Sequence, residues 1–302
     1  MKHPYDFELF EYNNTMISEI LENISKRIHI QANSIENGLT TGFKDLDRLT
    51  QGLGRSDLIL LASRPEMGKT AMALSILKHV ITESKKPAVY FSLESSKEQI
   101  VKRLLAMIGE IEYRGLVSGC IPPDDWEQYC FAVETLKNTQ LLIDDTPFPD
   151  LTELENRCRK YKAKQKIQFI VVDYLQLIYQ PTYSFVQNDH VENACVSRGL
   201  KELTEELEVP ILVLSQVSRA VEHRANPRPE MKDIISFDAG GGFFDLVWIL
   251  YRDEYYNAAT GEKNIAELNV ARNPRGSRGI LKLEYEPNFL HFVNLPDGSC
   301  PR

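Results

Sequence analysis

The sequence lacks the features that would place the protein in a membrane, outside the cell, or on duplex DNA by bulk charge. No apolar run in its 302 residues approaches the roughly 18 residues of a membrane span. The opening, MKHPYDFELFEYNN, is acidic and has no apolar core of a signal peptide, so we expect a cytoplasmic protein with no membrane partner. The formal net charge is −8, so any contact with nucleic acid must come from a local basic strip.

Cysteines are few, odd in number and scattered. The chain has five, with no C-x-x-C motif and no paired histidine spacing. This pattern favours structural thiols in a reducing compartment over a disulfide framework or a zinc site. With 43% hydrophobic and 26% charged residues, the composition is that of an ordinary globular protein, which can form one large α/β domain or two small ones.

Two segments of different character follow one another along the chain. Residues 1–34 carry no strand pattern, and nothing in them can cover their narrow apolar stripe. We therefore expect an amphipathic helix that docks elsewhere, on the main domain or on a neighbouring subunit. Residues 35–302 are expected to form the main domain. The stripe consists of Met16, Ile17, Ile20, Leu21, Ile24 and Ile28.

Short apolar runs alternate with helical patterns through most of the second segment. This alternation predicts an α/β fold with a mostly parallel sheet and helices on both faces. The last two runs alternate apolar and polar residues around a turn signal at 273–276, which predicts an antiparallel hairpin at the sheet edge. A capping pair, Thr152 and Glu155, predicts a helix start at Thr152. The predicted strands are Leu58–Ala62, Ala88–Ser92, Leu141–Ile143, Phe169–Val172, Ile211–Leu214 and Leu246–Tyr251, then the hairpin strands Ile265–Ala271 and Ile280–Tyr285.

The tripeptide Gly68-Lys69-Thr70 lies between a predicted strand and a predicted helix, which is the context of a phosphate-binding loop. Backbone N–H groups there favour phosphate oxygens, Lys69 places its ammonium near the β- and γ-phosphates, and Thr70 offers its hydroxyl to Mg²⁺. The alternative is an exposed lysine at a helix start. The pattern G-x-x-x-x-G-K-[ST] has a glycine where Ser63 stands, but serine is small and Pro65 can hold the turn. We expect ATP to contact Ser63, Arg64, Pro65, Glu66, Met67, Gly68, Lys69, Thr70 and Ala71.

Polar residues end three other predicted strands: Asp173 ends FIVVD, Glu94 ends FSLE and Gln216 ends LSQ. Because the carboxyl ends of parallel strands meet the ligand crevice, Asp173 would face the Mg²⁺ held by Thr70. Glu94 could orient or deprotonate the attacking water, and Gln216 could bond the γ-phosphate. Each also has an ordinary structural interpretation, as a cap, a turn residue or a first-turn acid of the next helix.

The hairpin region is locally basic, with Arg272, Arg275, Arg278 and Lys282 against Glu267. Arginines at a hairpin tip can form a solvated surface, bind a polyanion, or reach across an interface to a neighbour's γ-phosphate. The residues alone do not decide among these roles.

Eight ordered blocks carry a resemblance to a known family. Together they resemble the C-terminal motor domain of DnaB-type replicative DNA helicases, a ring-forming branch of the RecA-like ATPases. The resemblance runs from about Thr41 to Asn294. Members of the family lack the first glycine of the phosphate loop and carry Arg-Pro just after that point, which Arg64-Pro65 match. The blocks are TGFKDLDRLTQGLGRSDLI (41–59), SRPEMGKT (63–70), FSLE (91–94), DDTP (144–147), VVDYLQLI (171–178), LKELTEELEVPILVLSQVSR (200–219), RP (228–229) and LYRDEYY (250–256).

The resemblance implies a RecA-like core that assembles into hexamers, with ATP and Mg²⁺ between subunits and single-stranded DNA in the channel. Lys69 and Thr70 look like the phosphate and Mg²⁺ ligands, and Glu94 like the catalytic base. Asp173 looks like the Walker B acid and Gln216 like the γ-phosphate sensor. A helicase loader or another replication protein is an implied further partner.

The resemblance also implies roles for the N-terminal apolar stripe and for the C-terminal hairpin. The stripe before residue 34 resembles the family's linker helix, which packs on the adjacent subunit, and the helical domain that usually precedes it is missing from this sequence. In the family the hairpin supplies a Lys-x-Arg pair to the neighbour's ATP. The arginine of this pair, the arginine finger, contacts the neighbour's γ-phosphate. Here Arg272 matches the lysine, while the finger position falls on Pro274 or, with a one-residue shift, on Arg275. We expect Arg275 to be the finger.

One segment departs from the family. Between Asp233 and Asp245 the family reads approximately D-[IL]-R-E-S-G-S-I-E-Q-D-A-D, and part of that loop holds the DNA backbone, whereas this chain reads DIISFDAGGGFFD. Without cations there, DNA affinity should be weaker and its salt dependence shallower, although glycine N–H groups can still contact phosphate. The candidate DNA contacts are Gly240, Gly241 and Gly242, with the preceding cations Arg219, Arg224, Arg228 and Lys232.

The function implied is an ATP-driven hexameric helicase or translocase on single-stranded DNA in replication. The alternative keeps the ATPase without unwinding, as a nucleotide-switched assembly platform in replication, plasmid maintenance, phage or defence. A non-catalytic interaction subunit would need a dead site, and the intact Lys69, Thr70, Glu94 and Asp173 speak against it.

Overall fold

The computed structural model describes residues 17–19, 21, 38–147, 150–178, 189–235 and 241–296. It divides the chain into two units, Met1–Gly38 and Leu39–Arg302, which are described separately. In the first unit, residues 17–19 and 21 are helical, and Ile17 and Leu21 are exposed. The docking of this helix stays a prediction. The rest of the predicted stripe lies outside the described residues: Met16, Ile20, Ile24 and Ile28.

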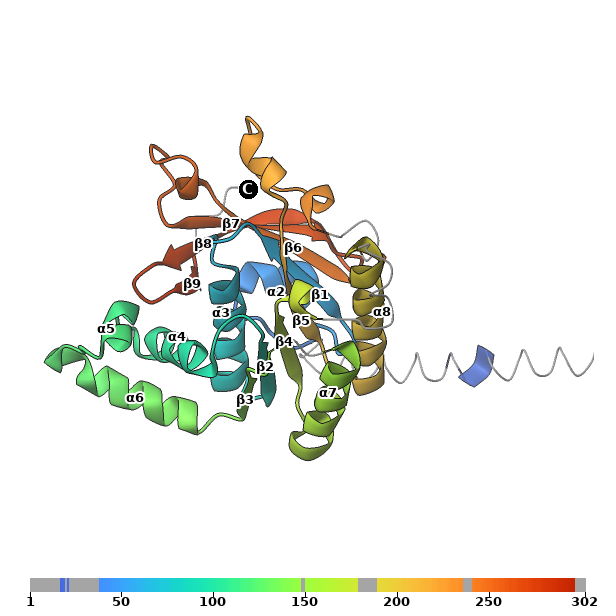
Figure 1. The fold of residues 1–302 in the computed structure, drawn as a ribbon, viewed down its shortest axis with the longest axis horizontal. Helices are drawn as coiled ribbons and strands as arrows, with labels where there is room; N and C mark the ends of the chain where they lie inside the picture. The colour runs from blue at the N-terminus through green and yellow to red at the C-terminus, as the bar shows by residue number, and fades with distance from the viewer. Residues whose placement is uncertain are drawn as a thin grey trace, which may run out of the picture. The chain divides into compact units, whose positions relative to one another are not determined.

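Within the described part of the second unit, nine strands form one sheet in the order β3-β2-β4-β5-β1-β6-β7-β8-β9 (Figure 1). The first six in this order run parallel, and β7, β8 and β9 are antiparallel. The predicted fold class and hairpin are therefore confirmed. The strands are β1 (Leu58–Ser63), β2 (Ala88–Ser92), β3 (Leu141–Asp144), β4 (Phe169–Asp173), β5 (Ile211–Gln216), β6 (Leu246–Arg252), β7 (Ile265–Arg272), β8 (Gly279–Glu286) and β9 (His291–Asn294).

Helices cover both faces of the parallel strands, which explains why these strands read as continuous apolar runs. Successive residues of a strand point to opposite faces, so β1 sends Ile59 and Leu61 into the core beneath α3 and α4. Leu58 and Leu60 enter the second core, beneath α7 and α8. None of the described helices is long and apolar enough to cross a membrane. The helices are α2 (Lys44–Thr50), α3 (Lys69–Thr82), α4 (Lys97–Gly109), α5 (Tyr113–Ser118), α6 (Trp126–Lys137), α7 (Leu151–Gln165) and α8 (Asp189–Leu207).

The predicted start of α7 at Thr152 is wrong. The helix begins at Leu151, and its N-cap is Asp150, whose carboxylate accepts a hydrogen bond from the Glu153 N–H at 2.7 Å. Aspartate caps a helix at least as well as threonine, and this start also buries Leu151 against the sheet. Strand β9 was not predicted, because its four residues, HFVN, include only two apolar ones and show neither an apolar run nor an alternation.

The parallel strands give the sheet two distinct ends. At the carboxyl end, β1 finishes with Ser63 and leads into the loop before α3. At the amino end, β1 begins after Asp57. Strand β7 runs the other way, so Arg272 at its end pairs with Val247 at the start of β6, and the turn at 273–278 lies at the amino end. Six residues of β1 separate the two ends by about 20 Å, since a parallel strand rises about 3.3 Å per residue.

Candidate active site

Four adjacent strands bring the predicted site residues together at the carboxyl end. These strands lie in the order β2-β4-β5-β1 across the sheet. Ser92 at the end of β2 pairs with Asp173, and Ser63 at the end of β1 pairs with Gln216. Glu94 follows β2 directly and is exposed at the same edge. The two acids, the amide and the phosphate loop therefore lie together at the carboxyl ends of these strands.

The loop between β1 and α3 has the shape that its glycine permits. Gly68 has φ +94°, and a Cβ at this position would lie 2.9 Å from the ring of Phe292. Its carbonyl accepts the Met72 N–H at 2.8 Å and so starts α3. Another residue at this position would be strained and would clash. Of the other residues predicted to contact the nucleotide, the loop exposes Pro65 and Glu66, partly exposes Lys69 and Thr70, and buries Ser63, Arg64, Met67 and Ala71.

Arg64 ties the loop to the segment that follows β5. Its Nη1 donates to the Val217 carbonyl at 2.9 Å, and its Nε donates to Glu222 at 2.8 Å. The side chain is buried, so these partners compensate the cost of desolvating the guanidinium. Arg64 therefore connects the phosphate loop to the segment that follows β5. That Arg64 contacts ATP stays a prediction.

Thr70 and Asp173 are in direct contact. The Thr70 hydroxyl donates to Oδ2 of Asp173 at 2.9 Å, and the Tyr90 hydroxyl donates to the same oxygen at 2.7 Å. The other oxygen, Oδ1, is buried without a hydrogen-bond partner among the described residues. A buried carboxylate oxygen is costly to leave unpaired, so this atom needs a cation or a bound water. The arrangement fits Mg²⁺, which takes one or two carboxylates from the protein and further oxygens from phosphate and water.

Lys69 lies beside these acids. Burial lowers the pKa of its ammonium, while Asp173 and Glu94 favour the charged form. Its Nζ also lies 5.3 Å from the centre of the Tyr174 ring, within the range of a cation–π contact. A desolvated ammonium with no tight ion pair in the described structure is placed to interact with an anionic ligand.

Gln216 connects this edge to the segment that departs from the family. Its carbonyl accepts the Ile235 N–H at 3.0 Å, and the next residues pair through the Val217–Ile234 bridge. The Ser218 N–H donates to the Asp233 carbonyl at 2.8 Å. The end of β5 is therefore joined by backbone hydrogen bonds to residues 233–235. Gly240, a predicted DNA contact, lies outside the described residues, and Gly241 and Gly242 begin a short 3-10 turn.

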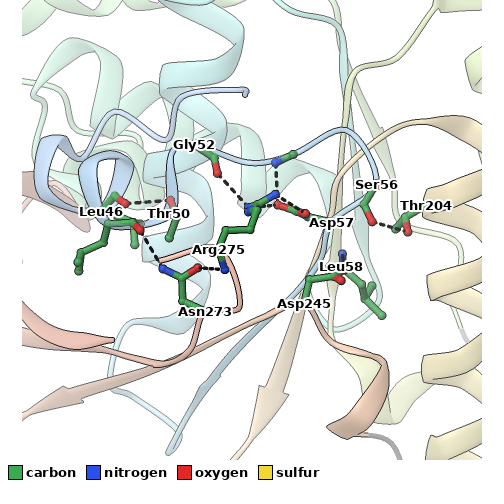
Figure 2. A network of polar contacts seen from close by, with 12 residues as sticks. Leu46, Thr50, Gly52, Ser56, Asp57, Leu58, Thr204, Asp245, Asn273 and Arg275 are labelled. Carbon is green, nitrogen blue, oxygen red and sulfur yellow. Dashed lines mark hydrogen bonds and ion pairs between the residues drawn. The ribbon is translucent and has the colours of Figure 1, made fainter. Parts of the chain in front are cut away.

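At the amino end, Arg275 forms an ion pair within its own chain. Figure 2 shows its guanidinium facing Asp57, with Nη1 and Nη2 donating to the two carboxylate oxygens at 2.8 and 2.5 Å. The Gly54 N–H also donates to Asp57, at 2.6 Å. Burial raises the pKa of Asp57, and Arg275 opposes this shift. Since both terminal guanidinium nitrogens bind Asp57, an Arg275 finger would require this pair to open.

The turn around Arg275 is held by further contacts (Figure 2). The Asn273 amide donates to the carbonyls of Leu49 at 2.8 Å and Ser277 at 3.0 Å. A Cβ on Gly276 would lie 2.6 Å from the Leu49 carbonyl oxygen, so only glycine fits this approach. Arg272 stands at the base of the turn, 3.5 Å from the Gly242 carbonyl. The turn is thereby fixed to the last turn of α2.

Three of the four cations predicted to contact DNA are in ion pairs within the chain. Arg224 pairs with Asp233, and Lys232 pairs with Glu230 at 2.8 Å. Arg228 lies 2.7 Å from Glu267 and stacks over the Tyr251 ring at 4.7 Å. For Arg219, which is exposed, the described residues offer no ion pair. That these cations compensate for the missing loop cations on DNA stays a prediction.

Comparison with known proteins identifies the class. The family model described as the DnaB-like helicase C terminal domain matches residues 38–294, so the chain belongs to this family. Among its relatives, "Replicative DNA helicase DnaB" of Geobacillus stearothermophilus is 42% identical over 85% of this chain and 57% of that protein. "Replicative DNA helicase DnaC" of Bacillus subtilis (strain 168) is 38% identical over 95% of this chain and 62% of that protein. The chain thus spans about three fifths of these relatives' length.

Solved structures agree with this assignment. A structure described as an ATPase domain has a TM-score of 0.86 and 30% identity, covering 93% of this chain and 99% of that one. A structure described as a DnaB-like replicative helicase and its interactions with primase has a TM-score of 0.84 and 30% identity, covering 92% of this chain and 66% of that one. The RecA-like ATPase core implied by the sequence is confirmed.

Sequence patterns did not reveal two residues of these sites. Tyr90 occupies a strand position where any apolar residue would fit the pattern, and its hydroxyl contact depends on the neighbouring strand. Asp57 precedes β1 by one residue, and its partner Arg275 lies 218 positions away in the sequence. The signal in the sequence is an acid directly before a buried apolar strand, where a carboxylate needs a partner.

Proposed function

We propose that this chain is the ATP-hydrolysing motor of a ring-forming helicase that translocates on single-stranded DNA during replication. The carrying observation is the convergence of the phosphate loop, Glu94, Asp173 and Gln216 on one edge of the sheet. The names of its relatives support the same activity. As a replication ATPase it would act in the cytoplasm.

The residues divide the chemistry as follows. Loop N–H groups and the Lys69 ammonium bind phosphate oxygens, and their charge remains in place as negative charge develops on the transferred group. Glu94 orients the attacking water and accepts its proton. The Gln216 amide bonds the γ-phosphate, and its backbone bond to Ile235 passes nucleotide state to the following segment. When bound, Mg²⁺ neutralises phosphate charge, and Thr70 and Asp173 are the residues that would hold it.

The site needs a second subunit. The hairpin cations lie at the amino end of the sheet, about 20 Å from the phosphate loop of the same chain. They can serve a nucleotide only across an interface, which supports a ring of head-to-tail contacts, with six members in this proposal. We assign the cation offered to the neighbour to Arg272, because it matches the lysine of the family's Lys-x-Arg pair. The sequence-based choice of Arg275 remains the competing prediction.

A DNA-independent assembly platform is the second candidate. It draws on the ion pairs that occupy Arg224, Arg228 and Lys232 and on the cation-free stretch from 233 to 251. If the chain is a helicase instead, this surface binds DNA through backbone N–H groups and few cations, so its affinity for DNA is low at high salt. A loader or another replication protein would then assist assembly on DNA.

Two measurements on the same preparation test the proposal. ATP turnover is followed with Mg²⁺, with and without single-stranded DNA, and strand displacement is followed at low salt, with Lys69→Ala as the inactive control. Oligomer mass is measured with nucleotide bound. We expect hexamers, DNA-stimulated turnover and displacement. Turnover that ignores DNA, with no displacement, supports the assembly platform and contradicts the motor.

A further inference from the structure

Tyr90 is the buried residue whose polar contact the proposed mechanism does not yet use. It lies in the middle of β2, its side chain belongs to the core beneath α3, and it is fully buried. A buried tyrosine hydroxyl normally finds a partner, and here that partner is Oδ2 of Asp173 on the neighbouring strand, at 2.7 Å. If Tyr90 only filled space in the core, its hydroxyl contact with Asp173 would have no effect on the site.

The contact distinguishes the two oxygens of Asp173. Oδ2 accepts from both Tyr90 and Thr70, whereas Oδ1 is buried and has no partner among the described residues. Two donors converging on one oxygen fix the rotation of the carboxylate about its Cβ–Cγ bond. The free oxygen is therefore the one presented to a cation.

The direction of this hydrogen bond is also fixed. The Asp173 carboxylate offers only acceptor oxygens, and the Tyr90 hydroxyl has a proton to donate. Tyr90 is thus always the donor and Asp173 always the acceptor. The rigid ring of a core tyrosine loses little freedom in holding this geometry, unlike a flexible surface donor.

We propose that Tyr90 is a positioning residue for the metal site: its hydroxyl holds the Asp173 carboxylate so that Oδ1 faces the Mg²⁺ of the bound nucleotide. This inference rests on the proposed function, because it needs a Mg²⁺–nucleotide complex at this edge. Without the hydroxyl, the carboxylate keeps only the Thr70 contact and rotates more freely. The cost falls on metal binding, while phosphate binding by the loop is preserved.

The test is a Mg²⁺ titration of the full chain and of Tyr90→Phe, with a fluorescent ADP analogue reporting binding and ATP turnover followed in parallel. We expect the half-saturating Mg²⁺ concentration to rise about ten- to a hundredfold, as for loss of one hydrogen bond to a charged group. Analogue binding in EDTA and turnover at saturating Mg²⁺ should change less than about threefold. Tyr90→Ile, which places a β-branched apolar residue in the strand, should show the same Mg²⁺ shift.

The matched control is Tyr161→Phe. Its hydroxyl donates to Asp144 at 3.1 Å, again from a tyrosine to the acid that ends a strand, but on the edge strand β3. This variant should keep the wild-type Mg²⁺ requirement. If Tyr90→Phe and Tyr90→Ile also keep it, or lose only thermal stability, the inference is overturned while the proposed ATPase stands. A wild-type chain whose nucleotide binding ignores Mg²⁺ would overturn both.

Discussion

The charged residues at the two ends of strand β1 differ in whether they are paired within the chain. At the carboxyl end, Lys69 has no tight ion pair in the described structure, and one oxygen of Asp173 is buried without a partner. At the amino end, Arg275 and Asp57 satisfy each other within the chain, and the turn around them is fixed by backbone contacts. The unpaired groups at the carboxyl end suit the anionic ligand and the metal ion of the proposed function. The amino end is a turn whose charged groups and backbone are held by contacts within the chain.

The largest expected effect is at the carboxyl end. Lys69→Ala removes the buried ammonium, so ATP turnover should fall by about three orders of magnitude or more, as when a charge-stabilising group is lost from a phosphoryl-transfer site. The measurement is steady-state phosphate release, with a melting curve to show that the variant is folded. Turnover near the wild-type rate would mean that the loop is not the site.

The next effect compares the hairpin arginines. Arg272→Ala should lower the turnover number about a hundredfold while nucleotide binding is retained, because a cation donated across an interface acts mainly on the transition state. Arg275→Ala should have a smaller effect. Phosphate release and binding of a fluorescent nucleotide are measured for each variant.

Asp57→Asn separates the two roles of Arg275. If Arg275 is a structural tie, Asp57→Asn and Arg275→Ala should have similar effects on turnover and should each destabilise the fold by about 1 to 3 kcal/mol. The lower half of this range is favoured because the Arg275 side chain is 36% exposed. If Arg275 is the finger, Asp57→Asn frees it, and turnover holds or rises while Arg275→Ala is inactive.

The smallest expected effect concerns DNA. Arg219→Ala should reduce the slope of log affinity for single-stranded DNA against log salt by about 0.7, the value for one phosphate contact. Arg228→Ala should leave this slope nearly unchanged and lower the melting temperature instead, since Glu267 would lose its partner. Salt titrations of binding to labelled oligonucleotides, with melting curves, check both. A larger slope change for Arg228→Ala would show that its ion pair opens on DNA.

The carboxyl end was predictable from the sequence because its residues follow their strands directly. Once a strand and its direction are known, the residue at its end is placed, and Lys69, Asp173 and Gln216 come together by the rule for parallel sheets. The same logic found the hairpin. It placed the cap of α7 two residues late because Asp150 and Thr152 are both good capping residues.

Contacts between residues far apart in the sequence were less predictable, at either end of the sheet. Nothing near Arg275 or Arg228 indicates that Asp57 and Glu267 will face them. Tyr90 was missed for the same reason: its position fits a core strand, and only the register of β2 against β4 brings its hydroxyl to Asp173. Local patterns therefore find ligand-binding edges better than they find ion pairs within the chain.

The central claim is that the two ends of β1 meet across an interface, and mixing two inactive variants tests it most directly. Lys69→Ala and Arg272→Ala subunits are combined in equal amounts, and exchange is confirmed by oligomer mass. In a head-to-tail ring, one site in four pairs an intact loop with an intact hairpin, so turnover should recover to about one quarter of the wild-type rate. Exchanged oligomers that remain inactive at every mixing ratio would contradict the account.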